Sequence, residues 1–216
     1  MINHNIREKV STFFSGTDER FYTKGDIITF ANQDPEGVLY LTEGIVEQYD
    51  VTPEGNKVVV NVFKPASFFP MSWAINKTPN TYFYAALTDV KLRRAHPDKV
   101  AVFLQQNPDV MFDLLSRVYV GTDGLLRRLV LAASGIASNR LIFELLIEGH
   151  RFGGEASGAK KIVKIKQSSL AARSGLARET VSRELHKLER DGLVKLTKEG
   201  IVLYVEALED KLDVTV

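Results

Sequence analysis

Turn-forming residues recur about every ten positions in the first half of this chain, and no other feature limits its possible folds as strongly. Between residues 21 and 95 they gather at Lys24-Gly25-Asp26, Asp34-Pro35-Glu36-Gly37, Glu43-Gly44 and Pro53-Glu54-Gly55-Asn56. β-Branched and aromatic runs, such as residues 38–41 and 58–63, lie between these clusters and are typical of short strands. Short strands at even spacing favour a small antiparallel barrel or jelly roll, which we therefore predict here.

The pattern becomes helical after residue 97. Residues 98–104 predict a short helix, and residues 109–133 predict a long one. Apolar residues follow the long helix at near-heptad spacing: Phe112, Leu115, Tyr119 (or Val118), Leu126, Leu129 and Ala133. This stripe is wide for a helix that covers a small barrel, so a self-pairing helix is favoured over simple core packing. Two glycines suggest a close backbone approach or a bend in it: Gly121 and Gly124. Residues 138–149 predict a further helix and residues 151–158 a flexible loop.

The charged residues are unevenly distributed along a chain whose net charge is +1. Residues 158–198 contain 11 Lys and Arg against 4 Asp and Glu, a local balance of +7. The residues before this segment carry 16 against 18, and those after it carry 1 against 5. A basic segment on a nearly neutral protein is typical of a nucleic-acid-binding module, although many charged runs are ordinary solvated faces.

The basic segment contains the pattern of a helix-turn-helix. One helix fits residues 168–174, and Gly175 supplies the tight turn that two crossed helices need. A second helix begins at about Ala177, and Gly192 ends it. Its apolar stripe has i, i+4, i+7 spacing and consists of Val181, Leu185 and Leu188. A strand–turn–strand pattern follows at residues 193–205, so we predict a winged helix-turn-helix.

The first residues of the second helix have side chains suited to reading bases in the major groove of DNA. An arginine can donate two hydrogen bonds to O6 and N7 of guanine, and a glutamate can accept one from the amino group of cytosine. The candidates for base reading are Arg178, Glu179 and Arg183. The two arginines lie about 140° apart around the helix axis, so they can reach different base pairs of one half-site. The candidates for phosphate contacts, which set register without reading sequence, are Gln167, Thr180, Ser182 and Lys187.

This segment resembles the catabolite-activator (CRP/FNR) family of bacterial transcription regulators. The resemblance is carried by Arg178-Glu179-Thr180-Val181-Ser182-Arg183, followed by Leu185, Leu188, Glu189 and Leu193. It implies an α+β chain with a cyclic-nucleotide-binding-like sensor domain at residues 1–108, a dimerisation helix at 109–134 and a winged-helix DNA-binding domain at 135–216. It also implies a homodimer on a palindromic operator with TGTGA-like half-sites, and RNA polymerase as a protein partner. In family members with this pattern, the residues matching Arg178, Glu179 and Arg183 read the bases.

The barrel departs from family members that bind cyclic AMP. Those members have a Gly-Glu pair for the ribose and an Arg-Ser pair for the phosphate, whereas the matching stretches here are Phe68-Phe69-Pro70-Met71 and Pro79-Asn80-Thr81-Tyr82. Pro70 has no N–H donor and Asn80 has no charge, so we expect no cyclic AMP binding. An apolar or aromatic effector is one hypothesis, and rings that merely fill the barrel are the other. The residues of the candidate pocket are Phe68, Phe69, Met71, Trp73, Tyr82, Tyr84 and Leu125.

Composition argues against several other functions. The chain has no cysteine, which excludes disulfides and cysteine-held iron–sulfur clusters, and we expect no resident cofactor. Residues 21–95 contain no histidine, so a metal-binding barrel enzyme is not expected. No apolar run approaches the roughly 18–20 residues that span a membrane, and we expect a cytoplasmic protein. The remaining alternative to a DNA-binding regulator is a ligand-sensing module that acts on a protein partner.

Overall fold

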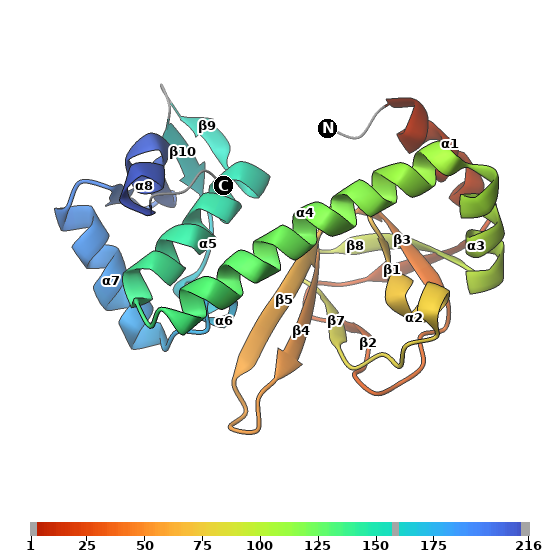
Figure 1. The fold of residues 1–216 in the computed structure, drawn as a ribbon, viewed down its shortest axis with the longest axis horizontal. Coiled ribbons are helices and arrows are strands. Elements are labelled where there is room, and N and C mark those ends of the chain that lie inside the picture. Colours follow the sequence, from red (N-terminus) through yellow and green to blue (C-terminus); the bar gives the residue numbers. More distant parts are fainter. Residues whose placement is uncertain (1–3, 157–159, 213–216) are drawn as a thin grey trace. The chain divides into compact units, whose positions relative to one another are not determined.

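The structure is a computed structural model that describes residues 4–156 and 160–212 (Figure 1). The chain divides into two compact units, Met1–Gly121 and Thr122–Val216, and the boundary falls inside helix α4 (Pro108–Ala133). The three-part division at residues 108 and 134 that the sequence suggests stays a prediction.

Two four-stranded antiparallel sheets form the body of the first unit. The strands are β1 Asp18–Tyr22, β2 Ile27–Thr29, β3 Val38–Glu43, β4 Val46–Val51, β5 Lys57–Phe63, β6 Phe68–Phe69, β7 Phe83–Ala86 and β8 Val90–Ala95. One sheet has the order β1-β8-β3-β6 and the other the order β2-β7-β4-β5. Strands far apart in sequence, such as β3 and β8, are thus neighbours, as in a jelly roll. The predicted barrel or jelly roll is confirmed.

Strand β3 explains the unbroken apolar run at residues 38–41. Leu39 and Leu41 belong to the hydrophobic cluster shared by the two sheets, whereas Val38 and Tyr40 belong to a second cluster shared with the helices. Because side chains alternate along a strand, a strand that is covered on both faces needs an apolar residue at every position. The helices of this unit are α1 His4–Ser15, α2 Met71–Asn76, α3 Pro97–Gln106 and the first part of α4.

Helix α4 leaves most of its apolar side chains exposed. Val110 is buried, but Phe112 is 73% and Leu129 is 65% exposed. The other large apolar residues exposed on α4 are Met111, Leu115, Val118, Tyr119, Val120, Leu125, Leu126 and Val130. The helix is continuous through Gly121 and Gly124, and a Cβ added at either would meet no described atom within 4 Å. Close packing against the described part of this chain is therefore not the reason for these glycines.

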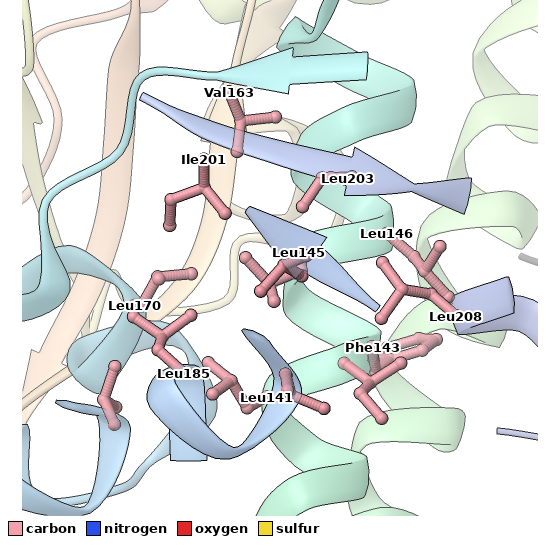
Figure 2. Packing of buried hydrophobic residues seen from close by; sticks show 14 of the residues in the cluster. Leu141, Phe143, Leu145, Leu146, Val163, Leu170, Leu185, Ile201, Leu203 and Leu208 are labelled. Atoms are coloured by element: carbon pink, nitrogen blue, oxygen red, sulfur yellow. The ribbon is translucent and has the colours of Figure 1, made fainter. Parts of the chain in front are cut away.

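Among its described residues, the second unit packs the last part of α4, four further helices and a four-stranded antiparallel sheet around one hydrophobic core. Its elements are α5 Ala137–Phe152, β9 Gly154–Ala156, β10 Lys160–Val163, α6 Gln167–Ser174, α7 Arg178–Arg190, β11 Val194–Leu196, β12 Ile201–Tyr204 and α8 Val205–Leu212. The sheet has the order β11-β12-β10-β9. Figure 2 shows Leu141 and Leu145 of α5 facing Leu170 and Leu185, which come from α6 and α7. Helix α5 thus supports both helices of the predicted helix-turn-helix.

Some elements differ from those that the sequence predicts. The loop predicted at residues 151–158 is wrong in part, because Arg151 and Phe152 complete α5 and Gly154–Ala156 form strand β9. Pairing with β10 overrides the loop preference of the glycines there. Residues 157–159 lie outside the described residues. Helices α1, α2 and α8 were not predicted, and α2 lies within the zone expected to contain strands.

Candidate nucleic-acid interface

The turn between α6 and α7 has the geometry that two crossed helices require. Helix α6 ends at Ser174, and Gly175 follows in the left-handed region with φ +62°. Its N–H donates to the carbonyl oxygen of Ala171. A Cβ added at Gly175 would lie 2.7 Å from Nη2 of Arg140. The positive φ therefore favours glycine here, as the sequence predicts, and an added side chain would displace the guanidinium of Arg140.

Helix α7 has a buried face and an exposed face. The buried face carries the predicted stripe, whose members are at most 1% exposed: Val181, Leu185 and Leu188. The other face carries exposed side chains and one half-buried serine: Arg178, Glu179, Ser182, Arg183 and His186. A helix that is divided in this way is held by its apolar stripe and presents its polar face to a partner.

The three predicted base-reading residues lie on the exposed face. Arg178 and Glu179 occupy the first turn of α7, where Ala177 provides no side-chain cap. Within residues 4–156 and 160–212, no hydrogen bond or ion pair engages either side chain. The side chain of Arg183 is 70% exposed, and its Nε lies 3.7 Å from Oε1 of Glu184. All three can meet an external ligand without breaking a strong contact.

The four predicted phosphate-contacting residues differ in exposure. Gln167 is the first residue of α6 and is half-buried, as are Thr180 and Ser182 on α7. Lys187 is exposed on α7. Lys187 is thus the residue of the four that can reach a phosphate with least rearrangement.

Two contacts from α5 to α6 support this interface and were not predicted from the sequence. Arg140 on α5 donates from Nε and Nη2 to the carbonyl oxygen of Ser174, at 2.9 and 2.5 Å, and from Nη2 to that of Gly175, at 2.6 Å. Arg173 on α6 pairs with Glu148 on α5, and both side chains are 8% exposed. These partners lie 34, 35 and 25 positions apart, so no local pattern reveals them.

A second buried carboxylate joins α5 to the last part of α4. Glu144 is 2% exposed, and Arg128 donates to it from Nε at 2.6 Å and from Nη2 at 3.0 Å. This two-bond geometry is the strong form of an arginine–carboxylate pair. Arg151 lies in the same charged layer, where burial and the neighbouring Arg173 and Arg128 lower its pKa. The sequence signal for this layer is two glutamates, four positions apart, inside an apolar run.

The β11–β12 hairpin is fixed to α7 by Glu189. Its Oε1 accepts a hydrogen bond from the N–H of Leu196 at 2.8 Å. The N–H of Leu193 donates to the carbonyl oxygen of Leu188 at 2.9 Å. Helix α7, the recognition helix of the predicted helix-turn-helix, and the hairpin that follows it are therefore held together.

The aromatic residues predicted to line an effector pocket are divided between two clusters. One cluster, on the helix side of sheet β1-β8-β3-β6, contains Phe68, Met71 and Trp73. The other, shared by the two sheets, contains Phe69, Tyr82 and Tyr84. There the rings of Phe69 and Tyr84 stack with centroids 5.1 Å apart, and Phe63 stacks on Phe69 at 4.5 Å. Burial raises the pKa of the Tyr84 hydroxyl. Leu125 belongs to the second unit.

Known protein families match both units. Residues 19–107 match the family described as the cyclic nucleotide-binding domain, and residues 139–211 match the Crp-like helix-turn-helix domain. The chain belongs to the CRP/FNR family of transcription regulators. This family is not typically enzymatic.

Relatives of this CRP/FNR protein align over most of its length. The transcriptional regulator SdrP of Thermus thermophilus is 28% identical over 81% of this chain and 83% of its own. The global nitrogen regulator of Synechocystis sp. is 26% identical over 85% of this chain and 83% of its own. A solved CRP/FNR-family regulator from Thermus thermophilus has the same fold, with a TM-score of 0.73, 24% identity, and coverage of 91% of this chain and 98% of its own.

In this CRP/FNR regulator, Asn80 is engaged in shaping a loop of the barrel. It is 6% exposed, and its Nδ2 donates to the carbonyl oxygens of Phe30 at 3.0 Å and Tyr82 at 2.9 Å. Its Oδ1 accepts from the N–H of Tyr82 at 3.3 Å. Pro70, which precedes α2, is buried and has no N–H to donate. Asn80 is therefore engaged within the barrel, and Pro70 offers no N–H donor.

Metal and membrane features are absent from the part of the regulator that the structure describes. No group of three or more His, Asp or Glu among these residues is placed to hold a metal ion. None of its helices combines the length and the apolar character needed to cross a bilayer.

Proposed function

We propose that this regulator binds a palindromic DNA operator as a homodimer, and that it does so without cyclic AMP. One α7 helix enters the major groove of each half-site. The observation that carries the proposal is the exposed first turn of α7, where Arg178 and Glu179 have no partner in the described chain and stand opposite a fully buried stripe. Packing of the described unit leaves these two side chains available to a partner outside the chain.

The chemistry of this turn suits base edges better than it suits a protein surface. Arg178 and Arg183 can each donate two hydrogen bonds to a guanine, and Glu179 can accept one from a cytosine. Gln167, Thr180, Ser182 and Lys187 are assigned to phosphate contacts, which hold the helix in register. A TGTGA-like half-site provides guanines for both arginines.

The exposed apolar residues of α4 support the homodimer. Monomeric proteins rarely leave a long apolar row in water, and near-heptad spacing is the pattern of paired helices. Pairing two α4 helices would bury Phe112, Leu126 and Leu129, which are all more than half exposed in one chain. A dimer would also supply two α7 helices, as a palindrome requires. RNA polymerase as a partner stays a prediction.

Independence from cyclic AMP is supported by the occupied positions in the barrel. A cyclic phosphodiester needs a fixed positive charge and available N–H donors. Asn80 has no charge, and its side-chain amide already donates to backbone carbonyl oxygens of the barrel. Pro70 has no N–H. The stacked Phe63, Phe69 and Tyr84 favour rings that fill the barrel over an apolar effector site.

Fluorescence anisotropy on two labelled duplexes tests the proposal. One duplex carries the palindrome TGTGA–TCACA, and the other carries the same bases scrambled. We expect the wild-type protein to prefer the palindrome, with or without added cyclic AMP. Arg178→Ala should weaken binding to the palindrome by about 1–3 kcal/mol for each half-site. The control Arg20→Ala removes an exposed arginine from β1 and should change neither affinity.

Because the true operator can differ from TGTGA–TCACA, a negative result needs a second assay on duplexes selected from a random library. If the palindrome and the scrambled duplex bind equally, the same assay is repeated on the sequences recovered from a random duplex library. Recovery of no preferred sequence, with and without cyclic AMP, contradicts the proposal and favours a module that acts on a protein partner. A preference that appears on addition of cyclic AMP contradicts the claim of independence.

A further inference from the structure

The guanidinium of Arg140 lies against the turn of the helix-turn-helix. It reaches from α5 to the carbonyl oxygens of Ser174, at 2.9 and 2.5 Å, and of Gly175, at 2.6 Å. Carbonyls at the end of a helix lack partners within it and carry the negative end of its dipole. Hydrogen bonds from a charged donor to such groups are stronger than neutral ones. Arg140 therefore ties the end of α6 and the turn to α5.

The position of this contact links Arg140 to the reading of bases. Two residues, Leu176 and Ala177, separate Gly175 from Arg178. A change in the backbone of the turn therefore reorients the start of α7, where Arg178 lies. A two-bond contact to guanine tolerates little change in direction, because hydrogen bonds weaken steeply away from linearity. An arginine that holds the carbonyl oxygens of the turn thus contributes to the direction in which α7 presents Arg178.

Other contacts hold α6 and α7 in the core, and the N–H groups of Gly175 and Leu176 bond to Ala171, whereas Arg140 holds the carbonyl side of the turn. Leu170 of α6 and Leu185 of α7 are fully buried, and Arg173 pairs with Glu148 of α5. These contacts fix where the helices lie. They involve neither the Ser174 carbonyl nor the Gly175 carbonyl, both of which accept from Arg140. Loss of Arg140 is therefore expected to disturb the turn more than the fold.

We propose that Arg140 is a positioning residue for base recognition, acting through Arg178 without touching DNA. This inference rests on the proposed function. It predicts that an arginine of α5 affects the affinity for one sequence and leaves sequence-independent binding intact. A phosphate-contacting arginine would weaken both kinds of binding together.

A double-mutant cycle on operator binding tests this role. The variants are Arg140→Gln, Arg178→Ala and the combination, each measured on the preferred palindrome and on the scrambled duplex. We expect Arg140→Gln to weaken palindrome binding about tenfold and to leave scrambled binding unchanged. In the Arg178→Ala background, the same substitution should have little further effect, because the arginine that it positions is gone. Arg140→Lys keeps one charged donor and should restore part of the affinity.

The controls separate positioning from folding. Arg20→Gln removes an exposed arginine of the first unit by the same substitution and should be silent. Thermal melting of every variant establishes that the protein is folded at the assay temperature. If Arg140→Gln does not fold, the comparison of Arg140→Lys with the wild type, in both Arg178 backgrounds, gives the same cycle.

The inference and the proposed function fail in different ways. Two results overturn the positioning role alone. One is an equal loss of affinity for both duplexes in Arg140→Gln. The other is a loss from Arg140→Gln that is as large in the Arg178→Ala background as in the wild type. No loss from Arg140→Gln overturns it as well. If Arg178→Ala itself leaves palindrome binding intact, base reading by Arg178 is wrong, and the role of Arg140 falls with it.

Discussion

Glu144 and Glu148 occupy successive turns of α5, and each meets an arginine from another helix. Glu144 receives two hydrogen bonds from Arg128, and Glu148 pairs with Arg173. Burying a carboxylate is unfavourable unless a partner charge and hydrogen bonds compensate for lost water. A buried pair of this kind contributes modestly as a whole, whereas either member alone is strongly destabilising. The two pairs thus fix which side of α5 faces α4 and α6.

We predict that Glu144→Gln destabilises the protein by about 3 kcal/mol, because it removes the buried carboxylate charge that the half-buried Arg128 meets with two hydrogen bonds. Urea unfolding followed by circular dichroism measures the change. Glu43→Gln is a matched control, since Glu43 is 67% exposed and pairs with Lys91 at the surface. Its effect should stay below about 1 kcal/mol. Similar losses for the two variants would contradict the account of Glu144.

The sequence predicts the roles of single residues on α7, but it does not predict the α5 residues that hold α4 and α6 in place. The stripe of Val181, Leu185 and Leu188 follows the helical repeat, so the buried and exposed faces can be read from spacing alone. Gly175 was predictable because a turn between crossed helices favours glycine. Arg140 and Glu144 contact residues of other helices, and the spacing of residues along one helix does not predict which helices will pack together.

At the scale of elements, helix α4 combines 26 residues with a largely exposed apolar surface. Val110 is its buried member, near the start of the helix. A single chain therefore leaves apolar area on α4 in contact with water. Covering that area in a second copy gains about 25 cal/mol for each Å² that is buried.

We predict that Leu129→Glu weakens self-association, because it places a charge in the row that two α4 helices would share. Loss of two leucine contacts per dimer should raise the dimer dissociation constant at least about tenfold. Sedimentation velocity across a concentration series measures it. Ile75→Glu, at a 56% exposed position on α2, serves as the control. Unchanged association in Leu129→Glu would exclude pairing through this part of α4.

Elements with a strong internal period were predicted, and elements that form because of a neighbour were not. Helix α4 and the strands β3 and β5 follow their own patterns. Strand β9 contains glycine and forms through pairing with β10. Helix α2 contains Met71 and Trp73, whose side chains pack in the cluster on the helix side of the sheet. In these cases tertiary contacts outweigh the local preference.

At the scale of the whole molecule, charge is concentrated where α6, α7 and the hairpin lie. Residues 158–198 have 11 Lys and Arg against 4 Asp and Glu, in a chain of net charge +1. Binding to DNA releases counterions in proportion to the number of phosphates that are neutralised. Affinity should therefore fall with salt on any duplex, while preference between duplexes depends on α7.

We predict that Lys187→Gln weakens binding to the palindrome and to the scrambled duplex alike. In a dimer it removes two phosphate contacts, so the slope of log affinity against log salt should become shallower by about two. Anisotropy titrations at four salt concentrations measure the slope. Lys77→Gln, at an exposed position of the first unit, should leave it unchanged. A loss confined to the palindrome would assign Lys187 to base reading instead.

The hydrophobic core around α7 is assembled, among the described residues, from positions between Leu131 and Leu212. The described residues of this core therefore all lie on the C-terminal side of the boundary in α4. In evolutionary terms, such a unit is portable: one DNA-reading module can be joined through the same helix to barrels that respond to different signals, and each module can diverge at its own rate.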